Sequence, residues 1–451
     1  MSGFNMTVRS VAAALGFEYT GDDFSLSGVS TDTRNIKAGE LFIALRGPNF
    51  DGHQFIEKAI AGGAVAIVSE QEVSHEIPSF IVDNSRHALG QLASAWRQQF
   101  DIPVIAVTGS NGKTTVKEML TSIFAQEGMP LSTKGNFNND IGVPLTLFRL
   151  EKNNTSAIIE MGANHSGEIE YLTALAKPTV ALVNNAAEAH LEGFGSLQGV
   201  AEAKGEIYSG LGTDGVAVIN VDDQYSYIWQ ELCEGKEFIT FGLINDADVS
   251  ATYEATDEGT KIQLRTNQKS GEVLLPLLGR HNVMNALAAT AAAFAAGVDF
   301  DVIRKGLQNM QSVSGRLQLK QGLASSRVID DTYNANPSSL RAGISVLVDF
   351  PGKHYLALGD MGELGDDEVQ LHHQAGVDAK AQGVDKLYAY GDLAQQAARG
   401  FADGAEWFGQ QQEMIKALQS DLNENVTLLV KGSRRMHMER VVEAVTKEVR
   451  S

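Results

Sequence analysis

Short apolar runs alternate with amphipathic segments of helical length along most of the chain, and this alternation predicts an α/β fold. In the N-terminal part, apolar runs at 41–45, 64–68 and 80–82 predict short strands. The segments 55–61 and 87–99 have the residue spacing of helices. The first part of the chain is therefore expected to form a small α/β domain.

The pattern changes at 101–103. A proline disfavours helical backbone in the residue before it, so Pro103 marks an entry into a new strand and a boundary between domains. The runs that follow predict a mostly parallel sheet, with additional strands within 247–276 and an alanine-rich helix at 282–296. The strands expected in the sheet itself are 104–107, 157–160, 180–183, 216–220 and 238–241.

A second boundary is expected at the polar, turn-like segment 312–316. Beyond it, apolar runs again alternate with helix-length segments, which predicts a doubly wound, Rossmann-like sheet. Its expected strands are 328–331, 354–358, 386–390 and 426–430. The chain is therefore predicted to have three domains, at 1–101, 102–314 and 315–451.

Length and charge limit the possible functions. A chain of 451 residues is too long for one hydrophobic core, which agrees with several domains. The net charge of −20 makes a nucleic-acid backbone an unfavourable partner. The single cysteine excludes an internal disulfide, and no apolar run has membrane-spanning length. We expect a cytoplasmic, monomeric protein that does not insert into membranes.

The most informative motif follows the predicted strand 104–107. A strand that breaks into glycines and then Lys-Thr at a helix start can surround a phosphate with backbone N–H groups. The common phosphate loop has four residues between its first glycine and Gly-Lys, whereas only two separate Gly109 from Gly112. An ordinary glycine-rich turn is the alternative. We expect the phosphates of a nucleoside triphosphate to be bound by Gly109, Ser110, Asn111, Gly112, Lys113, Thr114 and Thr115.

Polar residues that follow other predicted strands belong to the same crevice, because ligands of α/β sheets collect at the carboxyl ends of strands. Glu160 ends one strand and offers the hard oxygen that Mg²⁺ prefers. His190 follows the next strand and is either a ligand in the crevice or a structural residue. Lys204 lies between glutamates in a predicted helix, where its spacing indicates no more than an exposed lysine.

Two candidates lie at or beyond the second boundary. Arg316 could approach a γ-phosphate when the domains close, and the alternative is a surface arginine. Asp330 and Asp331 end a predicted strand, and adjacent carboxylates are costly to bury without partners. They either bind a polar ligand or belong to a loop that caps the helix starting near Pro337.

Together these segments resemble the Mur ligases, a family of ATP-dependent enzymes that form amide bonds. Residues 108–115 are similar to the shortened phosphate loop of that family, and 279–289 to its adenine-side helix. The resemblance implies ATP and two Mg²⁺ ions as cofactors. It assigns the metals to Thr114, Glu160, His190 and a CO₂-derived carbamate on Lys204. It places Asn282 and Asn285 near adenine, Asp331 near the ribose, and Lys113, Lys204, His190 and Arg316 in catalysis.

Four strings favour one branch of the family, in which D-alanyl-D-alanine is joined to a UDP-N-acetylmuramoyl tripeptide during peptidoglycan precursor synthesis. They lie at 30–34 with 51–53, 135–144, 331–337 and 430–434, and the chain departs from the family pattern at 435–437. The implied reaction passes through an acyl phosphate and releases ADP and phosphate. The implied substrate-binding residues are Ser30, Thr31, Asp32, Arg34, Asp51, His53, Asn136, Asn138, Asn139, Asn334 and Asn336.

Two other functions remain open at this point. A folate-type polyglutamate ligase would share the phosphate loop and the lysine, but about 100 residues precede the central domain here, and such an enzyme lacks a dedicated UDP-binding domain. A nucleotide-regulated protein that hydrolyses ATP slowly would need no amine substrate. The third residue of the tripeptide, diaminopimelate or lysine, is not determined by these strings.

Overall fold

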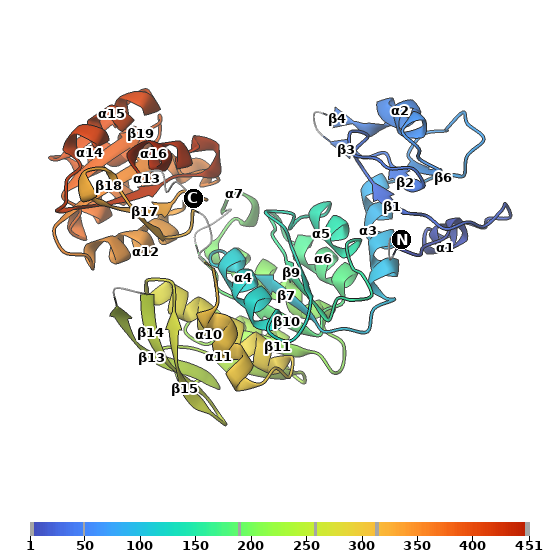
Figure 1. Ribbon diagram of the computed structural model, residues 1–451, viewed down its shortest axis with the longest axis horizontal. Helices are drawn as coiled ribbons and strands as arrows, with labels where there is room; N and C mark the ends of the chain where they lie inside the picture. Colours follow the sequence, from blue (N-terminus) through green and yellow to red (C-terminus); the bar gives the residue numbers. More distant parts are fainter. Residues whose placement is uncertain (1–3, 48–49, 188–190, 257–258, 312–314, 447–451) are drawn as a thin grey trace.

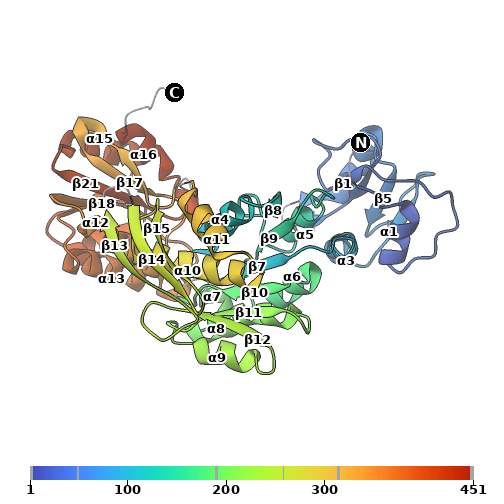
Figure 2. The same ribbon diagram turned by 60° about the horizontal axis from the view of Figure 1, so that its bottom comes forward.

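The computed structural model describes residues 4–47, 50–187, 191–256, 259–311 and 315–446, and it divides into three α/β parts. Figures 1 and 2 show the N-terminal part and the C-terminal part at opposite ends, with the central part between them. Each part has its own main sheet, and the strands of each sheet fall within one predicted domain. The predicted α/β fold class is confirmed.

The N-terminal part contains a four-stranded parallel sheet in the order β1-β2-β5-β6 and a small hairpin, β3–β4. Its strands are β1 (Gly28–Ser30), β2 (Glu40–Ile43), β3 (Arg46–Gly47), β4 (Phe50–Asp51), β5 (Ala66–Ser69) and β6 (Ser79–Ile81). Its helices are α1 (Val8–Ala14), the 3₁₀ turn η1 (Gly52–Phe55), α2 (Ile56–Ala61) and α3 (Ser85–Arg97). The Asn84 side chain caps α3, so this helix starts two residues earlier than its apolar pattern indicated.

The central part is a nine-stranded sheet in the order β15-β14-β13-β12-β11-β10-β7-β9-β8. The strands from β8 to β13 are parallel, and β13–β15 form an antiparallel extension. They are β7 (Val104–Thr108), β8 (Pro130–Ser132), β9 (Ser156–Glu160), β10 (Val180–Val183), β11 (Val216–Asn220), β12 (Glu237–Phe241), β13 (Val249–Thr256), β14 (Gly259–Thr266) and β15 (Ser270–Leu275). The helices are α4 (Lys113–Phe124), α5 (Gly142–Leu147), α6 (Glu168–Ala176), α7 (Leu191–Phe194), α8 (Leu197–Gly205), η2 (Glu206–Gly210), α9 (Ser226–Leu232), α10 (Arg280–Ala295) and α11 (Phe300–Gln308).

The C-terminal part is a six-stranded sheet in the order β16-β17-β21-β18-β19-β20, parallel except for the edge strand β16. Its strands are β16 (Gln318–Gln321), β17 (Arg327–Asp331), β18 (Lys353–Gly359), β19 (Lys386–Tyr390), β20 (Ala405–Phe408) and β21 (Val426–Lys431). The helices are η3 (Leu323–Ser325), α12 (Pro337–Val348), η4 (Gly365–Asp367), α13 (Glu368–Ala381), α14 (Ala394–Phe401), α15 (Gln411–Asp421), η5 (Arg434–Met436) and α16 (Glu439–Val445).

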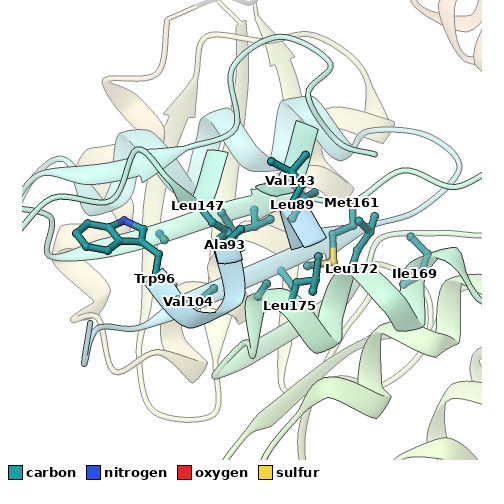
Figure 3. Close-up of a cluster of buried hydrophobic side chains, with 14 of the residues drawn as sticks. Leu89, Ala93, Trp96, Val104, Val143, Leu147, Met161, Ile169, Leu172 and Leu175 are labelled. Atoms are coloured by element: carbon teal, nitrogen blue, oxygen red, sulfur yellow. The ribbon is translucent and has the colours of Figure 1, made fainter. Parts of the chain in front are cut away.

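Helix α3 joins the N-terminal part to the central part through a continuous apolar core. Leu89, Ala93 and Trp96 of α3 lie in one buried cluster with side chains of α5 and α6 such as Leu147 and Leu172 (Figure 3). The Trp96 ring also packs against two phenylalanine rings of neighbouring segments. Helix α3 therefore belongs to the N-terminal part by its position in the sequence, but its side chains pack in both parts. A domain boundary at 101 does not describe this shared packing.

We predict that Trp96→Ala lowers the free energy of unfolding by about 3–5 kcal/mol, because it removes a large buried ring and leaves a cavity. Trp96 is 1% exposed, whereas Trp407 is 42% exposed. Trp407→Ala is the matched control, with an expected loss of about 1 kcal/mol or less. Denaturant unfolding measures both variants, and equal losses would contradict the role of α3 as the shared core element.

Candidate active site

A single cavity of about 1350 Å³ lies where the three parts meet. Its floor is formed by residues at the carboxyl ends of β7, β9, β10 and β11, the edge at which parallel sheets bind ligands. The C-terminal part lines one side, and the start of α3 contributes Asn84, Arg86 and His87. The volume exceeds the usual range for one small-molecule site, so the cavity can hold more than one ligand.

The turn between β7 and α4 forms the centre of the cavity. Gly109 and Gly112 have φ angles of 145° and 79°, which glycine adopts far more readily than other residues. Helix α4 begins immediately afterwards at Lys113, so its N-terminal N–H groups and positive dipole end lie at the turn. This geometry is that of an anion-binding loop.

Asparagines from neighbouring elements hold this turn in shape. The Asn184 amide donates to the Asn111 carbonyl and to Asn285 Oδ1, each at 2.9 Å. Asn185 Oδ1 accepts from the Asn111 backbone N–H at 2.9 Å. A Cβ atom on Gly112 would lie 2.3 Å from Asn285 Oδ1 and 2.4 Å from Asn184 Nδ2. The turn therefore excludes a side chain at 112.

Lys113 folds back over the loop, and its Nζ donates to the carbonyls of Gly109 at 2.6 Å and Ser110 at 3.2 Å. Burial lowers the pKa of Lys113, and the nearby Glu160 carboxylate opposes that shift. The Lys113 amino group thus lies directly against the backbone of the loop.

Glu160 ends β9 and is 2% exposed. Its Oε1 accepts a 2.9 Å hydrogen bond from the Asn138 amide, and its Oε2 is buried with no hydrogen-bond partner among the described residues. A buried carboxylate oxygen without a partner is costly unless a cation or donor binds there. Asn138 was predicted to bind substrate, but its amide is directed to this carboxylate.

Lys204 of α8 is not the exposed lysine that its sequence neighbours suggested. It is 1% exposed, its Nζ lies 5.2 Å from the centre of the Phe194 ring, and no described residue accepts a hydrogen bond from it. Burial lowers the pKa of Lys204 to about 7, and Lys113 adds to this shift, whereas Glu168 and Glu206 oppose it. Near pH 7, Lys204 is therefore a neutral amine in a large share of the protein molecules.

Two contacts connect the C-terminal part to the phosphate loop. Arg316 Nη2 donates to Thr114 Oγ1 at 2.9 Å, and the Asn336 amide donates to Asn111 Oδ1 at 2.9 Å. Asn336 also caps α12 through its own side chain. Arg316 is therefore not a detached surface residue in this conformation.

Asp331 and Lys431 form a buried ion pair at the carboxyl ends of the neighbouring strands β17 and β21, with Nζ 2.5 Å from Oδ2. Burial raises the pKa of Asp331, and Lys431 opposes the rise. Asp330 instead bonds Lys320 and Thr332. Asp331 lines the cavity, whereas Asp330 is absent from its lining.

Comparison with known proteins agrees with this architecture. The family descriptions "Mur ligase family, catalytic domain", "Mur ligase middle domain" and "Mur ligase, glutamate ligase domain" match residues 25–97, 107–293 and 315–434. The UDP-N-acetylmuramoyl-tripeptide–D-alanyl-D-alanine ligase of Escherichia coli (strain K12) is 44% identical over 98% of each chain. The chain belongs to the Mur ligase family.

Solved structures of family members share the whole fold. A crystal structure of MurF from Acinetobacter baumannii is 38% identical, has a TM-score of 0.91 and covers 97% of this chain and 98% of its own. MurF ligase from Thermotoga maritima in complex with ADP is 26% identical, has a TM-score of 0.83 and covers 92% and 96%. The predicted family and the predicted three-part Mur ligase architecture are confirmed.

As a Mur ligase, the chain brings most of the predicted site residues into one cavity. The predicted residues that line it are Ser110, Asn111, Gly112, Lys113, Thr114, Thr115, Asn136, Asn138, Asn139, Glu160, Asn282, Asn285, Arg316, Asp331, Asn334 and Asn336. Gly109 and Lys204 lie behind this surface. His190 lies outside the described residues. The functional roles of these residues stay predictions.

The six predicted residues of the N-terminal domain lie outside the lining of this cavity. Arg34 donates three side-chain hydrogen bonds to the Asp32 carboxylate and lowers the pKa of that carboxyl to about 2. His53 is buried between Asp51, which contacts its Nδ1 at 2.6 Å, and the Glu70 N–H, which donates to its Nε2. Both ring nitrogens of His53 are thus used within the domain. Ser30 and Thr31 keep their predicted role as substrate contacts without a structural test.

Two cavity residues that contact predicted site residues were not themselves predicted from the sequence. Lys431 pairs with Asp331, and the Tyr333 ring lies under Arg316 at 4.1 Å from ring centre to guanidinium carbon. Both lie inside strings used for the family resemblance, but their partners are distant in sequence.

Within the described residues, no three His, Cys, Asp or Glu side chains form a metal-binding group, and no helix has the length and apolarity to span a bilayer.

We predict that Gly112→Ala weakens ADP binding by about tenfold or more, because the new Cβ is strained at φ 79° and meets Asn184 and Asn285. Gly235→Ala is the control: Gly235 has φ 80° but open space around it. Calorimetric titration measures both affinities. Equal ADP affinity in the two variants would contradict the assignment of this turn as the phosphate-binding loop.

Proposed function

We propose that the chain is an ATP-dependent ligase that joins D-alanyl-D-alanine to the terminal carboxylate of UDP-N-acetylmuramoyl-tripeptide in peptidoglycan precursor synthesis. The observation that carries this proposal is the full-length similarity to ligases of that name, whose two-substrate reaction fits the large cavity shared by three domains. ADP and phosphate are the other products.

The tripeptide carboxylate attacks the γ-phosphorus of ATP, which forms an acyl phosphate and releases ADP. The neutral amine of the dipeptide then attacks the acyl carbon, and the tetrahedral intermediate expels phosphate. Phosphoryl transfer depends mainly on positioning and charge stabilisation. Lys113, Arg316 and the N-terminus of α4 are the cationic groups around the phosphate loop that supply it.

Mg²⁺ fits the donors beside this loop. Two hard oxygen donors line the cavity: the Thr114 hydroxyl and the buried Glu160 Oε2, which has no hydrogen-bond partner among the described residues. Mg²⁺ binds through few protein groups together with phosphates and water, so a larger carboxylate cluster is not required. Bound Mg²⁺ neutralises phosphate charge. A second ion at His190 stays a prediction, because that residue lies outside the described part of the chain.

A carbamate fits Lys204. Its neutral amine can attack CO₂, forming an N–C bond and losing a proton, which converts a buried cation into an anion with two oxygens. Two features favour this reaction over an unmodified ammonium group: the low pKa of about 7, and the burial of Nζ with no hydrogen-bond partner in the described part of the chain. Such an anion beside Lys113 would replace a repulsive contact with an attractive one.

The remaining substrate contacts follow the cavity. Asn282 and Asn285 of α10 line the side proposed for adenine, and Asp331 lines the side proposed for ribose. The N-terminal sheet is proposed to hold the UDP end through Ser30, Thr31, Asp32 and Arg34. Binding energy at that distant end can order the reacting carboxylate.

The N-terminal α/β domain disfavours the folate-type polyglutamate ligase, which has no need of a domain for a UDP group. A slow ATPase that acts as a switch is the remaining alternative. The protein is proposed to act as a monomer in the cytoplasm.

We predict that phosphate release from ATP requires both the UDP-muramoyl tripeptide and D-alanyl-D-alanine. Amidation of the tripeptide's terminal carboxylate should abolish it, because the attacking oxygen is blocked. Lys113→Ala should reduce kcat by about 100-fold, as expected for loss of one charge-stabilising group. A continuous phosphate assay measures each case. ATP hydrolysis that is indifferent to both substrates would reject the ligase assignment in favour of the switch.

We predict that ¹³CO₂ gives a ¹³C NMR carbamate signal that depends on Lys204. At constant dissolved CO₂ the signal should grow as pH rises through about 7, because the amine loses its proton there. An ordinary lysine would remain protonated up to about pH 10. Lys204→Ala should lose the signal and the activity, and small carboxylates should restore part of the activity.

Lys236→Ala is the control for this experiment, because Lys236 is half-buried and donates to the carbonyl of Tyr208. It should keep the carbamate signal. A signal that persists in Lys204→Ala would contradict the assignment of the modified residue.

A further inference from the structure

Tyr333 has no role in the reaction as proposed above, yet its ring carries the guanidinium of Arg316. The guanidinium carbon lies 4.1 Å from the ring centre, which is within the range of a cation–π contact. Arg316 Nη2 donates to Thr114 Oγ1. Its Nε is buried, and no described residue accepts a hydrogen bond from it. The ring face is therefore one source of stabilisation for this half-buried cation, beside the electrostatic attraction of the Asp331 carboxylate.

The backbone around Arg316 fixes the starting point of its side chain. Gly315 has φ 72° and Leu317 has φ 51°, so two left-handed residues flank the arginine. The Gly315 carbonyl accepts from the Tyr333 N–H at 3.0 Å, and a Cβ on Gly315 would lie 3.1 Å from that nitrogen. Residues 315–317 thus contact Tyr333 through its backbone as well as through its ring.

Mg²⁺ bound at Thr114 would compete with the hydrogen bond from Arg316. Thr114 Oγ1 is a proposed Mg²⁺ donor, and a divalent cation on the same oxygen would repel the guanidinium strongly at such short range. The guanidinium would then leave Thr114 Oγ1. Its contact with the Tyr333 ring does not involve that oxygen. The ring contact is the one that Arg316 can keep while its nitrogens turn toward a phosphate.

We propose that Tyr333 is a positioning residue whose ring supports the Arg316 guanidinium as it passes from Thr114 Oγ1 to the transferred phosphoryl group. This inference rests on the proposed function. Because the contact orients a group that acts on developing charge, its loss should lower kcat more than it raises the KM for ATP. Tyr333 needs only an aromatic face for this role, so its hydroxyl should be dispensable.

Steady-state kinetics of Tyr333→Phe and Tyr333→Leu test the role of the ring. Tyr333→Leu should lower kcat about tenfold with KM for ATP changed less than about twofold, and Tyr333→Phe should stay within about twofold of the parent. Phe350→Leu is the matched control, since its ring lies 5.9 Å from Arg327 away from the cavity. An unchanged kcat in Tyr333→Leu, or equal loss in Tyr333→Phe, would overturn the proposal.

A spectroscopic measurement separates this proposal from the ligase assignment, because it needs no turnover. In arginine-labelled protein, the Arg316 Nε–H resonance, identified by its absence in Arg316→Lys, should show a ring-current shift. The shift should persist in Tyr333→Phe and vanish in Tyr333→Leu. Its absence in the parent protein would overturn the proposal even if ligase activity is normal. Its presence in a protein without ligase activity would reject the proposed function alone.

A series of fluorinated phenylalanines at 333 covers the case in which Tyr333→Leu fails to fold. These rings keep their shape while fluorine withdraws the negative charge of the face. The logarithm of kcat should fall steadily with each added fluorine, and a flat series would overturn the proposal.

Discussion

The close approach of asparagine side chains to the phosphate loop is the constraint on which the site depends. Asn184 and Asn285 fill the space that a side chain at 112 would need, and their mutual hydrogen bond joins β10 to α10. Asn185 holds the backbone of Asn111 on the same side. The loop can be shorter than the common phosphate loop because neighbouring elements, rather than extra loop residues, support its shape.

Cationic side chains gather at the phosphate loop, although the chain as a whole is acidic. The chain carries a net charge of −20, but Arg316 and Lys204 both lie close enough to Lys113 for their charges to interact, and the Glu160 carboxylate partly offsets them at Lys113. A group of cations around the phosphate loop favours the binding of anions such as nucleotide phosphates. Burial then lowers the pKa of Lys204, because a second ammonium group in this environment would be repelled by Lys113 and poorly solvated.

Much of the fold could be predicted from local pattern. The strands at 180–183, 216–220 and 386–390 match β10, β11 and β19 to the residue, because continuous apolar runs identify strands buried on both faces. The short strands β1, β3, β4, β8, β16 and β20 were missed, since two to four residues carry little periodic signal. The shared role of α3 also escaped prediction, because one helix face packs on two domains.

The features of the site likewise divide into those that could be predicted from the sequence and those that could not. The loop residues and Glu160 could be placed because each follows a recognisable strand. The burial of Lys204 could not, because it arises from the packing of α8 against α9, where Trp229 Nε1 donates to the Ala201 carbonyl, and from the Phe194 ring. The partner of Asn138 and the ring under Arg316 are likewise tertiary contacts. Such contacts join residues more than 200 positions apart, as in the Arg316–Thr114 and Asn336–Asn111 hydrogen bonds.

The three domains line one cavity, and in the proposed reaction a substrate carboxylate attacks an ATP phosphate there. The sharpest test follows ¹⁸O from the doubly labelled terminal carboxylate of the UDP-muramoyl tripeptide into the released phosphate, which is analysed by mass spectrometry. One ¹⁸O is expected in each released phosphate and one in the new amide. Phosphate without ¹⁸O, released as fast as product forms, would contradict attack by the carboxylate and the acyl phosphate that follows from it.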